Sequence, residues 1–173
     1  SQAMAEKAFG KSFELYKGKN TAAPPTLSPL ERQRIGNPIL PSIAVDAACS
    51  GNPGIMEYRG VDTETQAEIF RLLPMKDGTN NIGEFLAIVH ALAFLKQRNL
   101  SLPIYSDSKI AMNWVRQKVC KTKVPHTPHN EKIFELIARA EKWLHQNTYP
   151  NPILKWETQA WGENPADFGR KDT

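Results

Sequence analysis

The order of hydrophobic runs and turns along residues 43–173 restricts this chain to a small set of folds. Three strand-like runs come first, over residues 43–48, 55–61 and 67–73. The segment Ser50-Gly51-Asn52-Pro53-Gly54 between the first two runs combines the strongest turn-forming residues. Strands joined by short turns pair as antiparallel neighbours, so these three runs predict a meander.

Helices and strands alternate after the meander. Phe85, Ile88, Val89, Leu92 and Leu95 recur at helical spacing, which predicts a helix from about residue 82 to 98 with a buried stripe. Further along the chain we predict strands over residues 103–106 and 153–156, helices over residues 107–118 and 130–146, and a short terminal helix after Gly162 that contains Asp167. This order predicts an α/β protein with a mixed sheet flanked by helices.

The first 42 residues differ in composition from the rest. Ser1-Gln2-Ala3 before Met4 is interpreted as a cloning remnant, and residues 5–19 predict a weak helix. Residues 21–41 hold five prolines, which remove backbone donors and disfavour helix, so this stretch predicts a linker or a strap. We therefore expect an N-terminal extension over residues 1–42 and one folded domain over residues 43–173.

Composition narrows the class of protein further. No apolar run reaches the ~18 residues needed to span a bilayer, and two cysteines (Cys49 and Cys120) make no disulfide framework. These features predict a cytoplasmic protein without a membrane partner. The 22 Lys and Arg residues exceed the 18 Asp and Glu residues, which gives a net charge of +4 and hints at a polyanionic partner.

Four carboxylates lie where ordinary surface charge is not expected: Asp46, Glu84, Asp107 and Asp167. Asp46 is flanked by apolar residues in a predicted central strand, and a carboxylate there must be paired or must bind a cation. The other three have simpler alternatives. Asp107 or its neighbour Ser106 is predicted near the N-cap of a helix. Glu84 could serve only as a negative charge in the first turn of a helix, where it interacts favourably with the helix dipole. Asp167 could be an ordinary surface residue.

Topology nevertheless brings these carboxylates together. Asp46 and Asp107 each follow a strand, and functional groups in open α/β sheets gather at the carboxyl ends of strands. Glu84 can reach the same place from the neighbouring helix. Such a cluster repels itself unless protons or divalent cations neutralise it, and hard oxygen ligands favour Mg²⁺ or Mn²⁺ over Zn²⁺.

Four segments in this order resemble type 1 ribonuclease H: Val45–Gly54, Thr79–Glu84, Tyr105–Ser108 and Trp161–Asp167. Each carries one of the four carboxylates, and together they extend through nearly all of residues 43–171. The resemblance implies a ribonuclease H-like fold with a five-stranded mixed sheet, three strands antiparallel and then two parallel, and residues 43–173 as the catalytic domain. It also implies an endonuclease that hydrolyses the RNA strand of RNA–DNA hybrids and leaves 5′-phosphate and 3′-hydroxyl ends.

The resemblance implies two Mg²⁺ ions, which Mn²⁺ can replace. Asp46 would be shared by both ions, Glu84 and Asp107 would hold the ion that activates water, and Asp167 would hold the ion at the leaving oxygen. Many relatives carry a catalytic His before the last Asp. This chain has Glu163 there, four residues before Asp167, which resembles a bacterial subgroup that uses Glu to position water or release product.

Substrate contacts are implied in the same way. The resemblance implies that the side chains of Asn52, Asn80 and Asn81 contact the RNA 2′-hydroxyl. Asn52 could instead be present only because the turn requires its backbone conformation. Contacts to the DNA strand are implied for Trp114, which could instead be core, and for Thr79, Thr122 and Thr158. Lys109 lies where relatives contact RNA.

Two other classes of function remain open from the sequence. One is another nuclease of the same superfamily, such as a Holliday-junction resolvase or a transposase core, although those lack the Asn80-Asn81 to Glu84 arrangement. The other is a binding module without activity, which the four intact carboxylates disfavour. We expect an RNA–DNA hybrid as the partner and a monomer as the active form.

Overall fold

The computed structural model describes residues 27–169, which divide into two compact units. The larger unit holds residues 39–156 and 163–169 of the described chain, and the smaller unit holds residues 27–38 and 157–162. The helix predicted over residues 5–19 lies outside the described residues.

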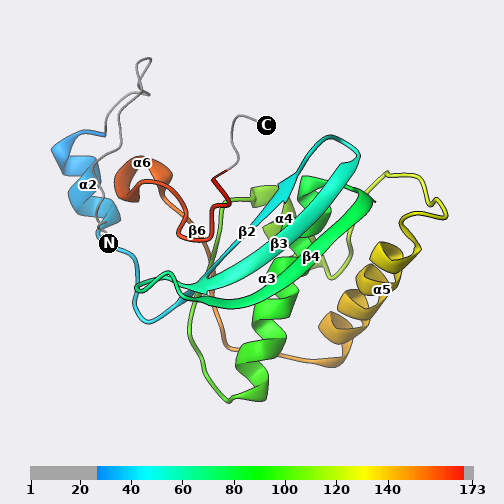
Figure 1. Ribbon diagram of the computed structural model, residues 1–173. Coiled ribbons are helices and arrows are strands. Elements are labelled where there is room, and N and C mark those ends of the chain that lie inside the picture. Colours follow the sequence, from blue (N-terminus) through cyan, green and yellow to red (C-terminus); the bar gives the residue numbers. More distant parts are fainter. Residues whose placement is uncertain (1–26, 170–173) are drawn as a thin grey trace. The chain divides into compact units, whose positions relative to one another are not determined.

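A five-stranded sheet forms the centre of the larger unit, in the order β4-β3-β2-β5-β6 (Figure 1). β2 (Ile43–Cys49), β3 (Gly54–Asp62) and β4 (Glu68–Gly78) are antiparallel, whereas β5 (Ile104–Ser106) runs parallel to β2 and β6 (Ile153–Lys155) runs parallel to β5. The predicted mixed sheet of three antiparallel and two parallel strands is confirmed. β4 continues to Gly78, beyond its predicted end at Leu73.

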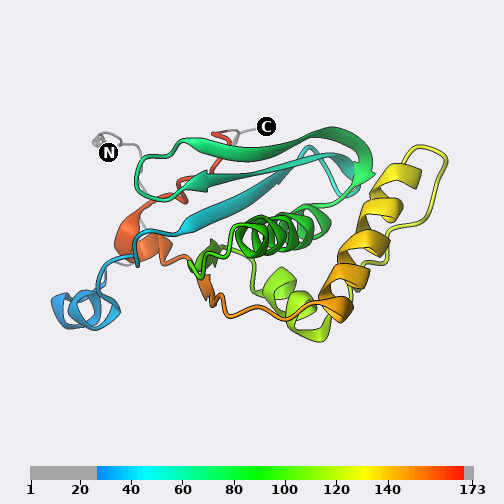
Figure 2. The same ribbon diagram turned by 90° about the horizontal axis from the view of Figure 1, so that it is seen from below.

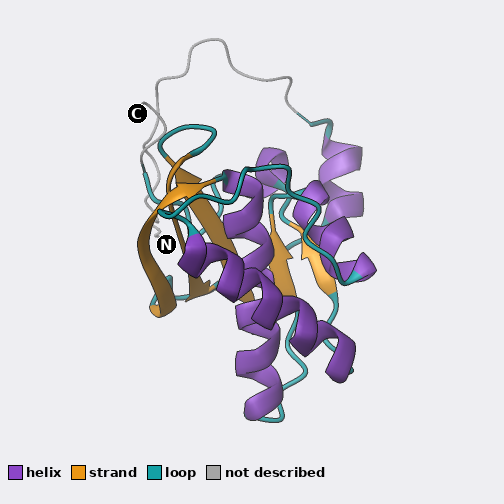
Figure 3. Ribbon diagram, turned by 90° about the vertical axis from the view of Figure 1, so that its right-hand side faces the viewer, coloured by secondary structure: helices purple, strands orange, loops and turns teal. Residues whose placement is uncertain are grey.

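Three helices lie on one side of this sheet: α3 (Asn80–Gln97), α4 (Lys109–Gln117) and α5 (Glu131–Gln146) (Figure 2). Figure 3 shows the same layers, with helices in purple and strands in orange. α3 contacts the sheet as well as α4 and α5, which explains why it is buried on nearly every side. It is the most apolar helix of the unit, yet no helix in the described residues is long and apolar enough to cross a membrane.

Hydrogen bonds of side chains fix where two of these helices begin. The Thr79 hydroxyl accepts from the Ile82 amide at 3.2 Å, so α3 begins at Asn80, slightly before the predicted residue 82. Ser106 and Asp107 lie near the N-cap of α4, as predicted, and the cap itself is Ser108. Ser108 Oγ accepts from the Ala111 amide at 3.0 Å, and the carboxylate of Asp107 makes other contacts.

The smaller unit contains α2 (Pro29–Ile35) and α6 (Thr158–Trp161). The expectation that residues 21–41 lack helix is wrong for residues 29–35. Ser28 and Glu31 form a reciprocal capping box with both hydrogen bonds at 3.1 Å, and Pro29 occupies the first turn, where its missing N–H costs nothing. Within this unit, Trp161 Nε1 donates to the carbonyl of Gly36 at 2.8 Å.

The predicted terminal helix after Gly162 is also wrong for the residues described. Residues 163–169 form turns and bends, and the short helix α6 precedes Gly162 instead of following it. The Asp167 amide donates to the carbonyl of Asn164 at 2.9 Å and closes a turn. Asp167 therefore lies on a short irregular segment of the larger unit.

Candidate active site

Asp46 lies on β2, with its side chain on the sheet face opposite α3. Val45 and Ala47 pack into the hydrophobic core, and side chains alternate along a strand, so Asp46 faces the other way. The residue is nevertheless buried, with 8% of its surface exposed. Arg59 is its cross-strand partner on β3.

β2 and β5 pair only at their beginnings, and this leaves an opening beside Asp46. Their parallel register joins Ile43 with Ile104 and Ala44 with Tyr105, and no later pair is formed. On its β5 side, Ala47 therefore has no partner strand. Glu84 Oε2 accepts a hydrogen bond from the Ala47 amide instead, at 3.3 Å. The sheet thus opens where Asp46 and Glu84 meet, as expected at the carboxyl ends of parallel strands.

Gly83 allows α3 to come this close to β2. A Cβ atom at Gly83 would lie 2.8 Å from the Cβ of Ala47 and 3.2 Å from the Cγ of Met56. Contact at 2.8 Å is shorter than carbon atoms allow, so only glycine fits without a shift. The close approach places Glu84, the next residue, at the open edge of β2.

Asp107 and Asp167 reach the same region from two other segments. Asp107 follows β5, and its Oδ2 accepts from Asn164 Nδ2 at 3.0 Å. Asp167 lies on the turn after Asn164, where its own Oδ2 accepts from the amide of Gly169 at 2.9 Å. The structure therefore brings together the four carboxylates that the sequence singled out.

Burial and mutual repulsion shift the protonation of the two innermost carboxyls. Burial raises the pKa of Asp46 to about 6, the nearby charges of Asp107 and Asp167 add to the rise, and contact with the Glu84 carboxyl offsets part of it. Burial, followed by the charge of Asp46, raises the pKa of Glu84 well above its usual value. A cation beside these groups would reverse both shifts.

The carboxylates fit a hard divalent cation such as Mg²⁺. Glu84 Oε1 is buried without a hydrogen-bond donor, and an unsatisfied buried oxygen is a natural metal ligand. Among residues 27–169, no three His, Cys, Asp or Glu side chains already surround one point at coordinating distance. A bound ion would therefore draw the carboxylates closer or take its remaining oxygens from water or phosphate.

A pocket of about 720 Å³ in the larger unit begins at Cys49, near the end of β2. It contains six of the eight residues predicted to contact substrate: Asn52, Thr79, Asn80, Asn81, Trp114 and Thr122. Lys121 and Lys123 line the same pocket and supply positive charge. Trp114 lines the pocket and also packs partly against the core, where its ring meets that of Phe85 edge-on at 6.4 Å. Its contact with the DNA strand stays a prediction.

Three predicted residues lie elsewhere. Lys109 is exposed on the first turn of α4 and does not line this pocket. Thr158 is the first residue of α6 in the smaller unit. Glu163 is exposed at the start of the turn that leads to Asp167. Their roles stay predictions.

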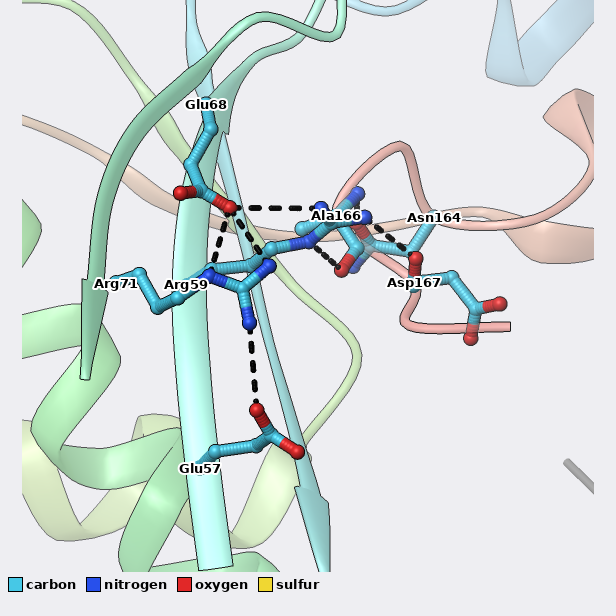
Figure 4. A network of polar contacts seen from close by, with 7 residues as sticks. All are labelled: Glu57, Arg59, Glu68, Arg71, Asn164, Ala166 and Asp167. Carbon is cyan, nitrogen blue, oxygen red and sulfur yellow. Dashed lines mark hydrogen bonds and ion pairs between the residues drawn. The ribbon is translucent and has the colours of Figure 1, made fainter. Parts of the chain in front are cut away.

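The structure adds three residues that the sequence reasoning missed. Asn130 is fully buried and donates to the carbonyls of Pro125, at 2.9 Å, and Asp77, at 3.2 Å, so it ties the pocket loop to the end of β4. Asn164 and Arg59 hold the turn that carries Asp167 (Figure 4). For Arg59 the sequence does offer a signal, because a charged residue within a predicted strand, opposite Asp46, is unusual.

The sequence is similar to those of known proteins. The family model described as RNase H matches residues 41–156. Ribonuclease H of Francisella philomiragia is 38% identical over 84 residues, which is 45% of this chain and 51% of that protein. Ribonuclease H of Francisella tularensis subsp. novicida is 37% identical over the same shares. The chain thus spans about half the length of these curated relatives.

Solved structures of low sequence identity are also similar. One is an RNase H1 isolated from compost, with 21% identity, a TM-score of 0.41, and coverage of 68% of this chain and 85% of that chain. Another is the N-terminal RNase H domain of a Mycobacterium tuberculosis protein, with 17% identity, a TM-score of 0.41, and coverage of 67% and 86%.

The family match contains most of the larger unit. It includes all five strands of the sheet and the carboxylates Asp46, Glu84 and Asp107, and it ends before the turn that carries Asp167. The chain belongs to the RNase H family.

Proposed function

We propose that this protein hydrolyses the RNA strand of RNA–DNA hybrids and leaves 5′-phosphate and 3′-hydroxyl ends. The observation that carries the proposal is the buried pair of Asp46 and Glu84 at the opening between β2 and β5, with one oxygen of Glu84 unsatisfied. Family membership supports it, as do the curated relatives named Ribonuclease H.

Four carboxylates would hold two Mg²⁺ ions, for which Mn²⁺ can substitute. Asp46 is assigned to both ions, Glu84 and Asp107 to the one on the side of the attacking water, and Asp167 to the one on the side of the leaving oxygen. Bound ions supply Lewis acidity and lower the pKa of a coordinated water. The protein supplies their placement, because the Ala47 amide orients Glu84 and Asn164 orients Asp107.

Glu163 is assigned an accessory role in positioning water or releasing product, as in the bacterial subgroup that has Glu in place of His. Two features support this assignment. Glu163 lies four residues before Asp167 in sequence, and it is exposed on the turn that carries that residue.

The pocket is assigned to the sugars and phosphates of the substrate. Asn52, Asn80 and Asn81 would read the 2′-hydroxyl with their amides. Within the pocket, the DNA strand would contact Trp114, Thr79 and Thr122. Lys109 and Thr158 lie outside the pocket lining, and contacts of Lys109 with RNA and of Thr158 with DNA are proposed from the resemblance alone. Lys121 and Lys123 extend this assignment, because they line the pocket and can pair with phosphates.

A panel of substrates tests the proposal against the other two classes of function. The panel holds an RNA–DNA hybrid, an RNA duplex, a DNA duplex and a four-way DNA junction, each incubated with the protein in Mg²⁺. The proposal predicts cleavage of the hybrid alone. Cleavage of the junction would instead indicate a structure-specific DNA nuclease, and binding of the hybrid without cleavage in Mg²⁺ or Mn²⁺ would indicate a binding module.

A further inference from the structure

The turn that carries Asp167 has little regular structure of its own to hold it. Residues 163–169 contain no helix or strand. The Asp167 carboxylate nevertheless has to keep a fixed place beside Asp46 and Asp107 if all three share cations. Contacts from the rest of the larger unit must therefore position this turn.

Asn164 is the first of these contacts, and this residue is 4% exposed. Its Nδ2 donates to the carbonyl of Val45 and to Asp107 Oδ2, both at 3.0 Å. Its Oδ1 accepts from the Ala166 amide at 2.8 Å. One amide thus joins the residue before Asp46, the carboxylate of Asp107 and the residue before Asp167.

Arg59 is the second contact and comes from β3 (Figure 4). Its Nε donates to the carbonyl of Ala166 at 2.8 Å, and its Nη2 donates to the carbonyl of Asp167 at 2.7 Å. A planar guanidinium can serve two neighbouring carbonyls at once, whereas a lysine ammonium has no such fork. Figure 4 shows the Asp167 carboxylate directed away from Arg59.

A second layer of charge fixes Arg59 itself. Glu68 Oε1 lies 3.6 Å from Arg59 Nη1 and 2.9 Å from Arg71 Nη2, and Arg71 Nη1 lies 3.3 Å from Glu57 Oε1. The two guanidinium groups lie 5.1 and 5.3 Å from the centre of the Phe168 ring, within the range of cation–π attraction. The residue after Asp167 is therefore held as well.

Arg59 does not act as the counter-ion of Asp46, although the two are cross-strand partners. Its donors point to two carbonyls and to Glu68. The contribution of Arg59 is therefore to position the turn.

We propose that Arg59 and Asn164 are positioning residues that fix Asp167 relative to Asp46 and Asp107 and thereby set the affinity of the site for divalent cations. The proposal rests on the proposed function for its link to cleavage, but its effect on cation binding can be measured without substrate. When either residue is removed, the turn gains freedom that a bound cation must then restrict. Cation affinity falls as a result, while the pocket that binds the hybrid keeps its shape.

The test compares the native protein with Arg59→Gln and Asn164→Ala. Binding of Mn²⁺ to the protein alone is followed by loss of the free-ion EPR signal, and hybrid cleavage is titrated with Mn²⁺. We expect each variant to bind Mn²⁺ about tenfold more weakly, as is usual when a residue that orients a metal ligand is lost. The Mn²⁺ concentration for half-maximal cleavage should rise by the same factor, while the KM for the hybrid stays within about twofold and saturating Mn²⁺ restores kcat.

Arg98→Gln is the matched control. Arg98 also donates to a backbone carbonyl, that of Phe94 at 3.3 Å, and also lies over an aromatic ring, at 3.7 Å, but it follows α3 at the end opposite Glu84. This variant should keep native Mn²⁺ affinity. Arg59→Lys keeps the charge but loses the forked guanidinium, so its Mn²⁺ affinity should lie between those of Arg59→Gln and the native protein. If Arg59→Gln does not fold, Arg59→Lys provides the same test.

Native Mn²⁺ affinity in folded Arg59→Gln and Asn164→Ala would overturn the proposal, as would a loss of kcat that saturating Mn²⁺ does not restore. These outcomes are separate from failure of the proposed function. A native protein that binds Mn²⁺ but never cleaves the hybrid would contradict the proposed function. The EPR comparison of the variants would still decide whether Arg59 and Asn164 position Asp167.

Discussion

At the scale of single residues, the candidate site is unfavourable to build without a cation. Asp46 and Glu84 are almost fully buried, they repel one another, and one oxygen of Glu84 has no donor. Burying such groups costs stability that a hydrophobic replacement would not. Either protons or a bound cation must neutralise them.

This repulsion predicts a pH dependence of stability in EDTA. The pKa of Asp46 is 3.8 in the unfolded chain and about 6 in the folded chain, so the folded state binds more protons between these values. The free energy of unfolding should therefore fall as pH rises through this window, by on the order of 2–3 kcal/mol for this residue. The raised pKa of Glu84 extends the fall to higher pH.

Glu84→Gln isolates the effect. This variant should show a shallower fall and should be more stable than the native protein at pH 8 in EDTA, because it removes one of the repelling charges. Urea unfolding at pH 5 and pH 8 measures this. Burial lowers the pKa of His90 and acts in the opposite sense at lower pH, but both proteins share that residue. Equal slopes for the two proteins would contradict the account.

Asp107→Asn should abolish cleavage and leave folding and hybrid binding intact. The oxygen of the new amide can still accept from Asn164, so the local contact survives while the charge is lost. Cleavage of a labelled hybrid and its binding by the folded variant are compared with those of the native protein. Cleavage at the native rate would show that Asp107 holds no catalytic ion.

The four carboxylates were predictable from sequence, whereas their supports were not. Asp46 is conspicuous because a charge interrupts an apolar strand. Asn164 is not, because its partners Val45 and Asp107 lie 119 and 57 residues away along the chain. Only the folded topology brings these groups to one amide.

At the scale of elements, the packing of α3 on β2 decides where Glu84 lies. Gly83→Ala should destabilise the protein by about 1–3 kcal/mol, because the new methyl overlaps Ala47 and packed cores resist added volume. Alanine favours helices over glycine by about 1 kcal/mol, so a net loss shows that the overlap dominates. Urea unfolding of the native and variant proteins gives the difference.

Ala47→Gly supplies the matched test of that contact. Removing the Cβ of Ala47 should recover part of the stability lost in Gly83→Ala, although glycine in a strand costs about 0.5–1 kcal/mol by itself. A double-mutant cycle measures the coupling. Strictly additive effects would mean that the helix does not approach the strand at this point.

Elements with a strong local pattern were predicted well, and irregular ones were not. The apolar spacing of α3 and the short turns between strands are local signals, so their interpretation does not depend on distant parts of the chain. The helix α2 was missed because the density of prolines outweighed the capping box at Ser28 and Glu31. The turn at Asp167 was mistaken for a helix because Arg59 and Asn164, not local preference, determine its backbone.

At the scale of the whole molecule, charge is divided between an acidic site and a basic remainder. The chain has 22 Lys and Arg residues against 18 Asp and Glu residues, and five of those acids, Asp46, Glu84, Asp107, Glu163 and Asp167, are assigned to the candidate site. Thirteen acids then face 22 basic residues elsewhere. A polyanion can therefore be attracted to the protein while its reactive phosphate meets carboxylates that cations neutralise.

The lysines of the pocket predict how hybrid binding responds to salt. Replacing both Lys121 and Lys123 by Gln should reduce the slope of log affinity against log salt by about two, since each lost phosphate contact removes about one. Lys132 and Lys142 on α5 lie outside the pocket lining, and replacing both by Gln is the matched control. Equal slopes for the two double variants would show that the pocket does not bind phosphate.

The most direct test of the central claim is a strand-resolved cleavage assay in Mg²⁺, with an RNA–DNA hybrid labelled on both strands. The account predicts that the native protein cuts only the RNA strand, at many positions, and leaves 5′-phosphate and 3′-hydroxyl ends, and that Asp107→Asn cuts neither strand. Cleavage of the DNA strand, or an intact hybrid in both Mg²⁺ and Mn²⁺, would contradict it.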